Sequence, residues 1–141
     1  MTTSPGGVVM EAENHPKFEC DVTHGPSGTR LHTEAPKDNG GTGMSFSPTD
    51  LVGAALATCM ITTMQLAASR ESLPWGTASA RVEKRMSPPP RRIAQLALEL
   101  RMPAGLAPEH RTRLEKIARE CPVARSLHPD LDVTSSFVYP D

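Results

Sequence analysis

The sequence predicts an α+β fold, and three observations lead to this prediction. The first third of the chain holds short segments typical of strands, separated by turn residues. An uncharged apolar stretch over residues 51–68 has the length of one long helix. The segments 77–86 and 93–102 alternate in polarity, as strands with one buried face do. The chain has 141 residues, no internal repeat and no long linker, so we expect a single domain over residues 1–141.

The first elements are three short strands. We expect them at residues 8–13, 17–23 and 29–33, with a turn at 25–28 that contains two glycines, a proline and a serine. Cys20 lies in the second strand, which reads as an amphipathic edge strand, and we interpret this cysteine as incidental to function.

The central helix has a well-defined start. Ser47 can cap it, Pro48 suits the first helical position, and Asp50 complements the helix dipole. We expect the helix to continue to about Ser69. The uncharged part of this helix could be mistaken for a membrane span, but it holds threonines, a glutamine and many alanines, and the chain has no second such segment. We therefore interpret it as a buried core helix.

The second half of the chain predicts two strands, a helix and a final strand. In the segment 93–102, the face that carries Leu96, Leu98 and Leu100 is the more apolar one. Pro108 opens an amphipathic helix, and a last strand covers residues 131–139. The helix that begins at Pro108 places four residues on one face: Leu114, Ile117, Ala118 and Cys121.

Composition argues against several classes of function. The net charge of −1 and the aromatic content of 4% do not favour binding of nucleic acid, carbohydrate or a membrane surface. Three cysteines are too few for a secreted disulfide scaffold, and no secretory leader opens the sequence, so we expect a cytoplasmic protein. No metal site and no cofactor are expected, because the following histidines show no metal-ligand spacing: His24, His32, His110 and His128.

Two cysteines carry the candidate chemistry. Cys59 lies inside the apolar helix with no charged residue within a helical turn, so any activating group must come from elsewhere in the fold. Cys121 precedes Pro122, which starts a new helical turn whose unpaired N–H groups favour a thiolate, and Arg119 and Arg125 add positive charge. A pair of thiols can reduce an oxidant without a cofactor. The alternative is that each cysteine is only a small core residue.

Three segments resemble the OsmC/Ohr family. Residues 46–60 (FSPTDLVGAALATCM) are similar to its central helix, and residues 121–129 (CPVARSLHP) are similar to its second cysteine motif. Residues 83–93 (EKRMSPPPRRI) fit one branch of the family, and the order of elements matches over nearly the whole chain. The resemblance implies a swapped α+β homodimer, in which strands of both protomers form sheets around long central helices.

The resemblance also implies a reaction. Cys59 would be the peroxidatic residue, which reduces an organic hydroperoxide, and Cys121 would resolve the resulting sulfenic acid to a disulfide. A dithiol would then reduce the disulfide, and no metal or bound cofactor would be needed. The flanking Leu56, Met60 and Met64 would receive the alkyl tail of the peroxide. The alternative is a non-catalytic OsmC-like protein that binds a small apolar ligand in the dimer cleft.

The chain departs from the family pattern at two positions that hold the peroxidatic thiolate. The family has a glutamate after the helix-opening proline, where this chain has Thr49. The family also has an arginine in the N-terminal part, for which only Arg30 and Lys17 are available here. Without a neighbouring cation, we expect burial to raise the pKa of Cys59 and to lower its thiolate fraction at neutral pH.

Overall fold

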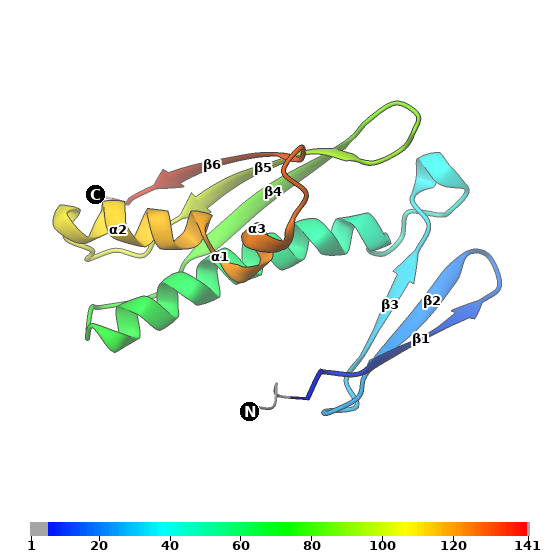
Figure 1. The fold of residues 1–141 in the computed structure, drawn as a ribbon, viewed down its shortest axis with the longest axis horizontal. Helices are drawn as coiled ribbons and strands as arrows, with labels where there is room; N and C mark the ends of the chain where they lie inside the picture. The colour runs from blue at the N-terminus through cyan, green and yellow to red at the C-terminus, as the bar shows by residue number, and fades with distance from the viewer. Residues whose placement is uncertain (1–5, 141) are drawn as a thin grey trace, which may run out of the picture. The chain divides into compact units, whose positions relative to one another are not determined.

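The computed structural model describes residues 6–140 and contains both helices and sheets, which confirms the predicted α+β class (Figure 1). The chain divides into two compact units, Met1–Leu51 and Val52–Asp141. Each unit contains one three-stranded sheet.

The N-terminal unit contains an antiparallel sheet of three strands in sequence order (Figure 1). Strands β1 (Met10–His15), β2 (Glu19–His24) and β3 (Arg30–Glu34) begin slightly later than the sequence predicts. A short 3-10 helix, η1 (Lys37–Asn39), follows β3. It ends at Gly40, whose φ of 92° lies in the left-handed region that glycine adopts without steric cost.

Among its described residues, the N-terminal unit buries no hydrophobic side chain. Its buried residues are Thr33, Glu34 and Ser47, all of them polar. Large apolar side chains of this unit are exposed instead: Val8, Val9, Met10, Phe18, Leu31, Met44 and Phe46. A sheet without an apolar core has little to stabilise it on its own.

The long helix α1 (Pro48–Arg70) begins where the sequence predicts. Ser47 Oγ accepts a hydrogen bond from the backbone N–H of Asp50 at 3.1 Å, and Asp50 Oδ2 accepts one from the N–H of Ser47 at 2.9 Å. This reciprocal arrangement satisfies two backbone donors near the helix start. Past the other end, Ser72 has a positive φ of 55° and the N–H of Leu73 donates to the carbonyl of Ala68.

The C-terminal unit contains a mixed sheet in the order β4-β5-β6 (Figure 1). Strand β4 (Ser79–Met86) pairs antiparallel with β5 (Ile93–Arg101), and β5 pairs parallel with β6 (Asp132–Val138). The parallel pair requires a crossover, which the helices between β5 and β6 supply. On β5, the predicted alternation is confirmed by the burial of Leu96, Leu98 and Leu100.

One face of α1 packs against this sheet and forms the hydrophobic core. Leu56, Met60 and Met64 of α1 join the leucines of β5 in a single cluster. The opposite face of α1 carries Ala55, Thr58, Thr62 and Leu66, which are exposed in the single chain. By length and composition α1 is apolar enough to cross a membrane. Within one protomer, only 33% of its most apolar 18-residue stretch is buried. The expectation of a helix buried on every side is therefore not met within one protomer.

Two further helices cover the same core. Proline opens both α2 (Pro108–Arg119) and α3 (Pro122–Ser126), as predicted for the two prolines. Leu114 and Ala118 of α2 are fully buried in the cluster that α1 and β5 form. Directly after β6, Tyr139 Oη donates a hydrogen bond to Glu115 Oε2 at 2.6 Å, which connects the end of this strand to α2.

The packing of α2 gives a direct test of the core. We expect Leu114→Ala to lower the free energy of unfolding by about 2–5 kcal/mol, because it leaves a cavity among fully buried neighbours. Thr112→Ala, at an exposed position of the same helix, should change it by less than about 0.5 kcal/mol. Urea denaturation followed by circular dichroism measures both, and equal effects would contradict the observed packing.

Candidate active site

The structure brings Cys59 and Cys121 together within the C-terminal unit. Cys59 lies on α1 and is half-buried against the core, whereas Cys121 is fully buried at the N-cap of α3. Their side chains form a hydrogen bond with each other. Both thiols are free, so this is the reduced form of the pair.

The pKa of Cys59 differs from the expectation. Partial burial raises the pKa of this thiol, but three hydrogen bonds to its sulfur outweigh burial. They come from the backbone N–H of Val123, from the thiol of Cys121 and from the hydroxyl of Thr63, whose oxygen lies 3.8 Å away. The net result is a pKa below the ordinary range of a cysteine. The prediction of a raised pKa was therefore wrong, because donors from α3 replace a cation.

The pKa of Cys121 is shifted in the opposite direction, above the ordinary range of a cysteine. Burial raises the pKa of its thiol, and donation of its proton to Cys59 raises it further. Backbone hydrogen bonds from Ala124 and Val123 oppose this effect without cancelling it. Cys121 does lie at the predicted helix start, but the thiolate that the sequence suggested for it is not favoured. Arg125, which the sequence suggested as a source of positive charge for Cys121, donates a hydrogen bond from Nε to the carbonyl of Glu120 at 2.7 Å.

The two shifts assign distinct chemical properties to the pair. When one proton has been lost, the charge is more stable on Cys59, which accepts hydrogen bonds, than on buried Cys121. The thiolate is the nucleophilic form of a cysteine. Cys59 is also the more accessible of the two. The arrangement therefore presents Cys59 as the nucleophile and Cys121 as a neighbouring, protonated thiol.

A cavity of about 440 Å³ lies in the same unit, and its lining includes Met60, the residue after Cys59 in the chain. Its apolar wall includes Leu56 and Met60, two of the three residues that the sequence suggested for an alkyl tail. The third, Met64, is buried in the same core cluster but is not part of this lining. Ala124, whose backbone N–H binds the Cys121 sulfur, also lines the cavity, as does Arg119.

Arg119 is the cation of this cavity, and the sequence gave it a role only beside Cys121. Its Nε donates to Ser135 Oγ at 3.2 Å, and its guanidinium lies 4.9 Å from the centre of the Phe137 ring. Glu115 forms a long ion pair with it at 3.8 Å. These contacts fix the position of the guanidinium at the cavity wall. The position of Arg119 in the sequence could not show that Ser135 and Phe137 of β6 would supply two of these contacts.

Thr49, which stands at the family's glutamate position, and the two nearby cations, Arg30 and Lys17, lie in the N-terminal unit. Thr49 Oγ1 lies 3.1 Å from Ser47 Oγ at the start of α1. Arg30 forms an ion pair with Asp21 at 3.3 Å, and Lys17 lies in the turn between β1 and β2 with a positive φ of 69°. Cys20 is a half-buried free thiol on β2.

Residues 41–136 match the family model described as OsmC-like protein. The chain belongs to the OsmC-like family. This match covers both cysteine motifs and confirms the resemblance found in the sequence. No curated protein matches the chain in sequence at a significant level.

Solved structures of the family share the fold over nearly the whole chain. A Psychrobacter arcticus protein, described as an osmotic stress induced and detoxification response protein, is 28% identical with a TM-score of 0.85, covering 98% of this chain and 99% of its own. An organic hydroperoxide resistance protein OsmC from Legionella pneumophila is 20% identical with a TM-score of 0.77, covering 96% and 99%. A Vibrio cholerae organic hydroperoxide resistance protein with captopril bound in one active site is 19% identical with a TM-score of 0.75, covering 96% and 93%.

The hydrogen bond between the two thiols leads to a prediction about reactivity. Cys121→Ala removes a donor to the Cys59 sulfur, so the pKa of Cys59 should rise and its thiolate fraction at pH 7 should fall. We expect alkylation of Cys59 by iodoacetamide at pH 7 to slow on the order of threefold to tenfold. Cys121→Ser keeps a hydroxyl donor and should slow it less.

The rates are measured by mass spectrometry of the peptide that contains Cys59, across pH 5 to 10. At high pH, where Cys59 is fully ionised in every variant, the difference between the variants should disappear. A difference that stays constant with pH would point to altered access rather than altered ionisation, and would contradict the role assigned to the Cys121 thiol.

Proposed function

We propose that this protein reduces organic hydroperoxides with its thiols, as part of oxidative-stress defence. The observation that carries the proposal is the hydrogen-bonded pair, in which the pKa of Cys59 is lowered and that of Cys121 is raised. Membership of the OsmC-like family and neighbours named for hydroperoxide resistance support a role in redox or peroxide stress.

The first step is oxidation of Cys59. Its thiolate attacks the terminal oxygen of the hydroperoxide, an S–O bond forms, and the O–O bond breaks. The sulfur is oxidised by two electrons to a sulfenic acid, and the alkoxide leaves and takes up a proton to become an alcohol. Arg119, fixed at the cavity wall, places positive charge on the side where the substrate enters.

The second step uses the neighbouring thiol. Cys121 attacks the sulfur of the sulfenic acid, an S–S bond forms, and the hydroxyl leaves with the Cys121 proton as water. The hydrogen bond between the two side chains means that the sulfurs need little movement to meet. An external dithiol then reduces the disulfide by thiol–disulfide exchange, and no metal or bound cofactor takes part in the cycle.

The cavity favours an organic substrate over hydrogen peroxide. Val133 supplies exposed apolar surface for an alkyl or aryl group, which hydrogen peroxide lacks, and the buried Leu56 and Met60 line the same cavity. Burial of that group adds binding energy for the organic substrate alone.

The same cavity supports a second candidate, a non-catalytic protein that binds a small apolar ligand. This alternative gains support from Thr49, which stands where family peroxidases have a glutamate. It predicts that Cys59 has no special reactivity toward peroxides, so kinetics separate the two functions.

We further propose that the functional molecule is a homodimer with strands exchanged between protomers. The N-terminal unit buries no apolar side chain among its described residues, and one face of α1 is exposed. A second copy could cover both surfaces. Both units would belong to one OsmC-like domain, since the family match runs across their boundary at Leu51. We place the protein in the cytoplasm, with no membrane or nucleic acid as partner.

Stopped-flow reaction of the reduced protein with cumene hydroperoxide tests the proposed activity. We expect one fast oxidation per site in the wild type, faster than with hydrogen peroxide, and none in Cys59→Ser. Cys121→Ser should still be oxidised once but should then stop at the sulfenic acid or overoxidise. Because Thr49 replaces the glutamate, turnover should stay below that of relatives with the complete site.

Cys20→Ser is the matched control, because it removes a free thiol but leaves the hydrogen-bonded pair intact. It should react like the wild type. Equal, slow loss of thiols in the wild type and in Cys59→Ser would reject the peroxidase and favour the ligand-binding alternative.

Sedimentation velocity at micromolar concentration tests the assembly. We expect the mass of two chains, because the exposed face of α1 and the coreless sheet need apolar partners. Leu66→Glu, which places a charge on the exposed face of α1, should shift the protein toward the monomer or toward aggregates. A well-behaved wild-type monomer would contradict the proposed dimer.

A further inference from the structure

The N-terminal sheet gathers histidine and carboxylate side chains on one of its faces. Strands β2 and β3 pair so that Glu19 lies opposite Glu34 and Asp21 lies opposite His32. Side chains two residues apart on a strand point to the same face. The register therefore brings all four side chains to one side of the β2–β3 pair.

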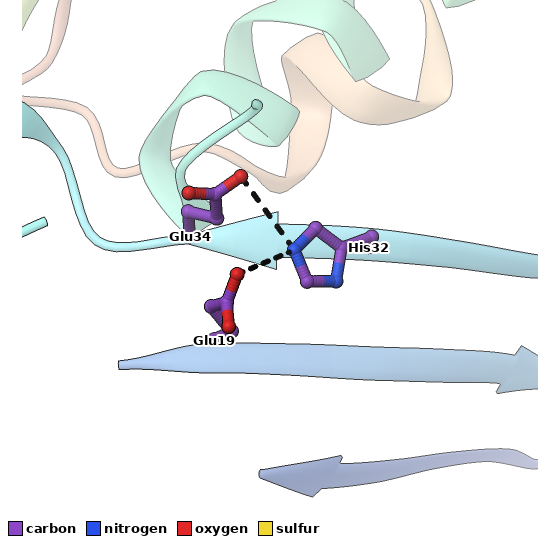
Figure 2. A group of neighbouring side chains, drawn as sticks. All are labelled: Glu19, His32 and Glu34. Atoms are coloured by element: carbon purple, nitrogen blue, oxygen red, sulfur yellow. Dashed lines mark ion pairs between the residues drawn. The ribbon is translucent and has the colours of Figure 1, made fainter. Parts of the chain in front are cut away.

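Three of these side chains converge on one point. Figure 2 shows the His32 ring beside the carboxylates of Glu19 and Glu34, with one nitrogen directed at both. His32 Nε2 lies 3.4 Å from Glu19 Oε1 and 3.6 Å from Glu34 Oε2. The three ligand atoms lie within 4.8 Å of one another.

These distances are long for hydrogen bonds, whose N···O separations are about 2.7–3.2 Å. They are ion-pair distances, and they also match the edges of a metal coordination sphere. Ligand atoms about 2.0–2.2 Å from a tetrahedral ion lie roughly 3.3–3.6 Å from each other. The two N···O distances around His32 Nε2 thus fit ligands around an ion, and the two carboxylate oxygens lie within 4.8 Å of each other.

The other nitrogen of His32 is fixed by Asp21. Asp21, a carboxylate that can only accept, is hydrogen-bonded to the rings of both His15 and His32. Asp21 Oδ1 therefore accepts a hydrogen bond from the Nδ1–H group of His32, with 3.0 Å between the two heavy atoms. In the neutral imidazole, this leaves the lone pair of Nε2 directed at two carboxylates. A carboxylate that orients a histidine in this way is the usual outer partner of a metal-bound histidine.

Glu34 is also held in place. Its side chain is only 10% exposed, and its Oε1 accepts a hydrogen bond from the hydroxyl of Thr42. Its Oε2 forms no hydrogen bond within the part of the chain that the structure describes, and has only the long contact with His32. A nearly buried carboxylate oxygen directed at a lone pair is unfavourable unless a metal ion or a proton lies between them.

We propose that Glu19, His32 and Glu34 form a binding site for a divalent transition metal ion, with Zn²⁺ as the best fit. One imidazole nitrogen and two carboxylate oxygens suit the borderline ions from Mn²⁺ to Zn²⁺, and among these Zn²⁺ accepts tetrahedral geometry most readily. Three protein ligands leave a coordination position open to solvent, because the His32 side chain is 40% exposed. The ion would link β2 to β3 in a unit without an apolar core, so its binding would stabilise this sheet.

The competing account is a protonated His32 that pairs with the same carboxylates. The hydrogen bond with Asp21 raises the pKa of His32, although partial burial opposes it. A proton on Nε2 would serve the same carboxylates as an ion would. The two accounts differ in a measurable way, since only the first predicts saturable uptake of metal at pH 7.5.

The test is titration of the reduced full-length protein with Zn²⁺ by calorimetry at pH 7.5, and with Co²⁺ by visible absorption. We expect one site per chain and a Co²⁺ spectrum without the intense band of sulfur ligation. Glu19→Gln and His32→Gln should each weaken binding at least tenfold, and Asp21→Asn about 10–100-fold through the orientation of His32. Zn²⁺ should also slow hydrogen exchange of the β2 and β3 amides in the wild type.

His24→Gln is the matched control, because this histidine lies on β2 but on the opposite face, hydrogen-bonded to Ser27. It should bind like the wild type. Glu19, with a side chain 32% exposed, is the ligand whose replacement disturbs the fold least. Absence of uptake by the wild type, or equal uptake by the wild type and Glu19→Gln, would overturn the proposal.

Discussion

The candidate active site depends on one contact, the hydrogen bond between the thiols of Cys59 and Cys121. Two thiols in an apolar setting would both resist ionisation, since burial disfavours charge. Here the fully buried thiol keeps its proton and donates it, and the half-buried thiol accepts it together with the N–H of Val123. One contact thereby displaces the two pKa values in opposite directions. A nucleophile and its resolving partner need this asymmetry.

The contact in turn depends on how α1, α2 and α3 are arranged. Pro122 cannot continue the preceding helix, so the chain turns after Arg119 and Cys121 becomes the N-cap of α3. The burial of Leu114 and Ala118 against α1 and β5 holds α2 on the core. These features bring the backbone of Val123 to the sulfur of Cys59. The chemistry therefore rests on ordinary apolar packing near the thiols.

Much of this architecture could be predicted from sequence, because it follows from local patterns. The start of α1 follows from Ser47 and Asp50, and the buried face of β5 from its alternating leucines. The pKa of Cys59 could not be predicted, since its strongest donor comes from Val123, far away in the chain. The same holds for His32. Its spacing to the cysteines and to the other histidines indicated no metal site, whereas the β2–β3 register places Glu19 opposite Glu34, on the same face as His32.

The absence of the family's glutamate and arginine pair has a physical consequence for the proposed reaction. A cation within about 4–6 Å stabilises a thiolate by charge, whereas hydrogen bonds from Val123, Cys121 and Thr63 do so with dipoles. Dipoles lower the pKa but leave the negative charge uncompensated as the peroxide enters and an alkoxide forms. In this chain the fixed cation lies at the cavity wall, where Ser135 and the Phe137 ring hold Arg119. Positive charge would then act on the departing oxygen rather than on the attacking sulfur.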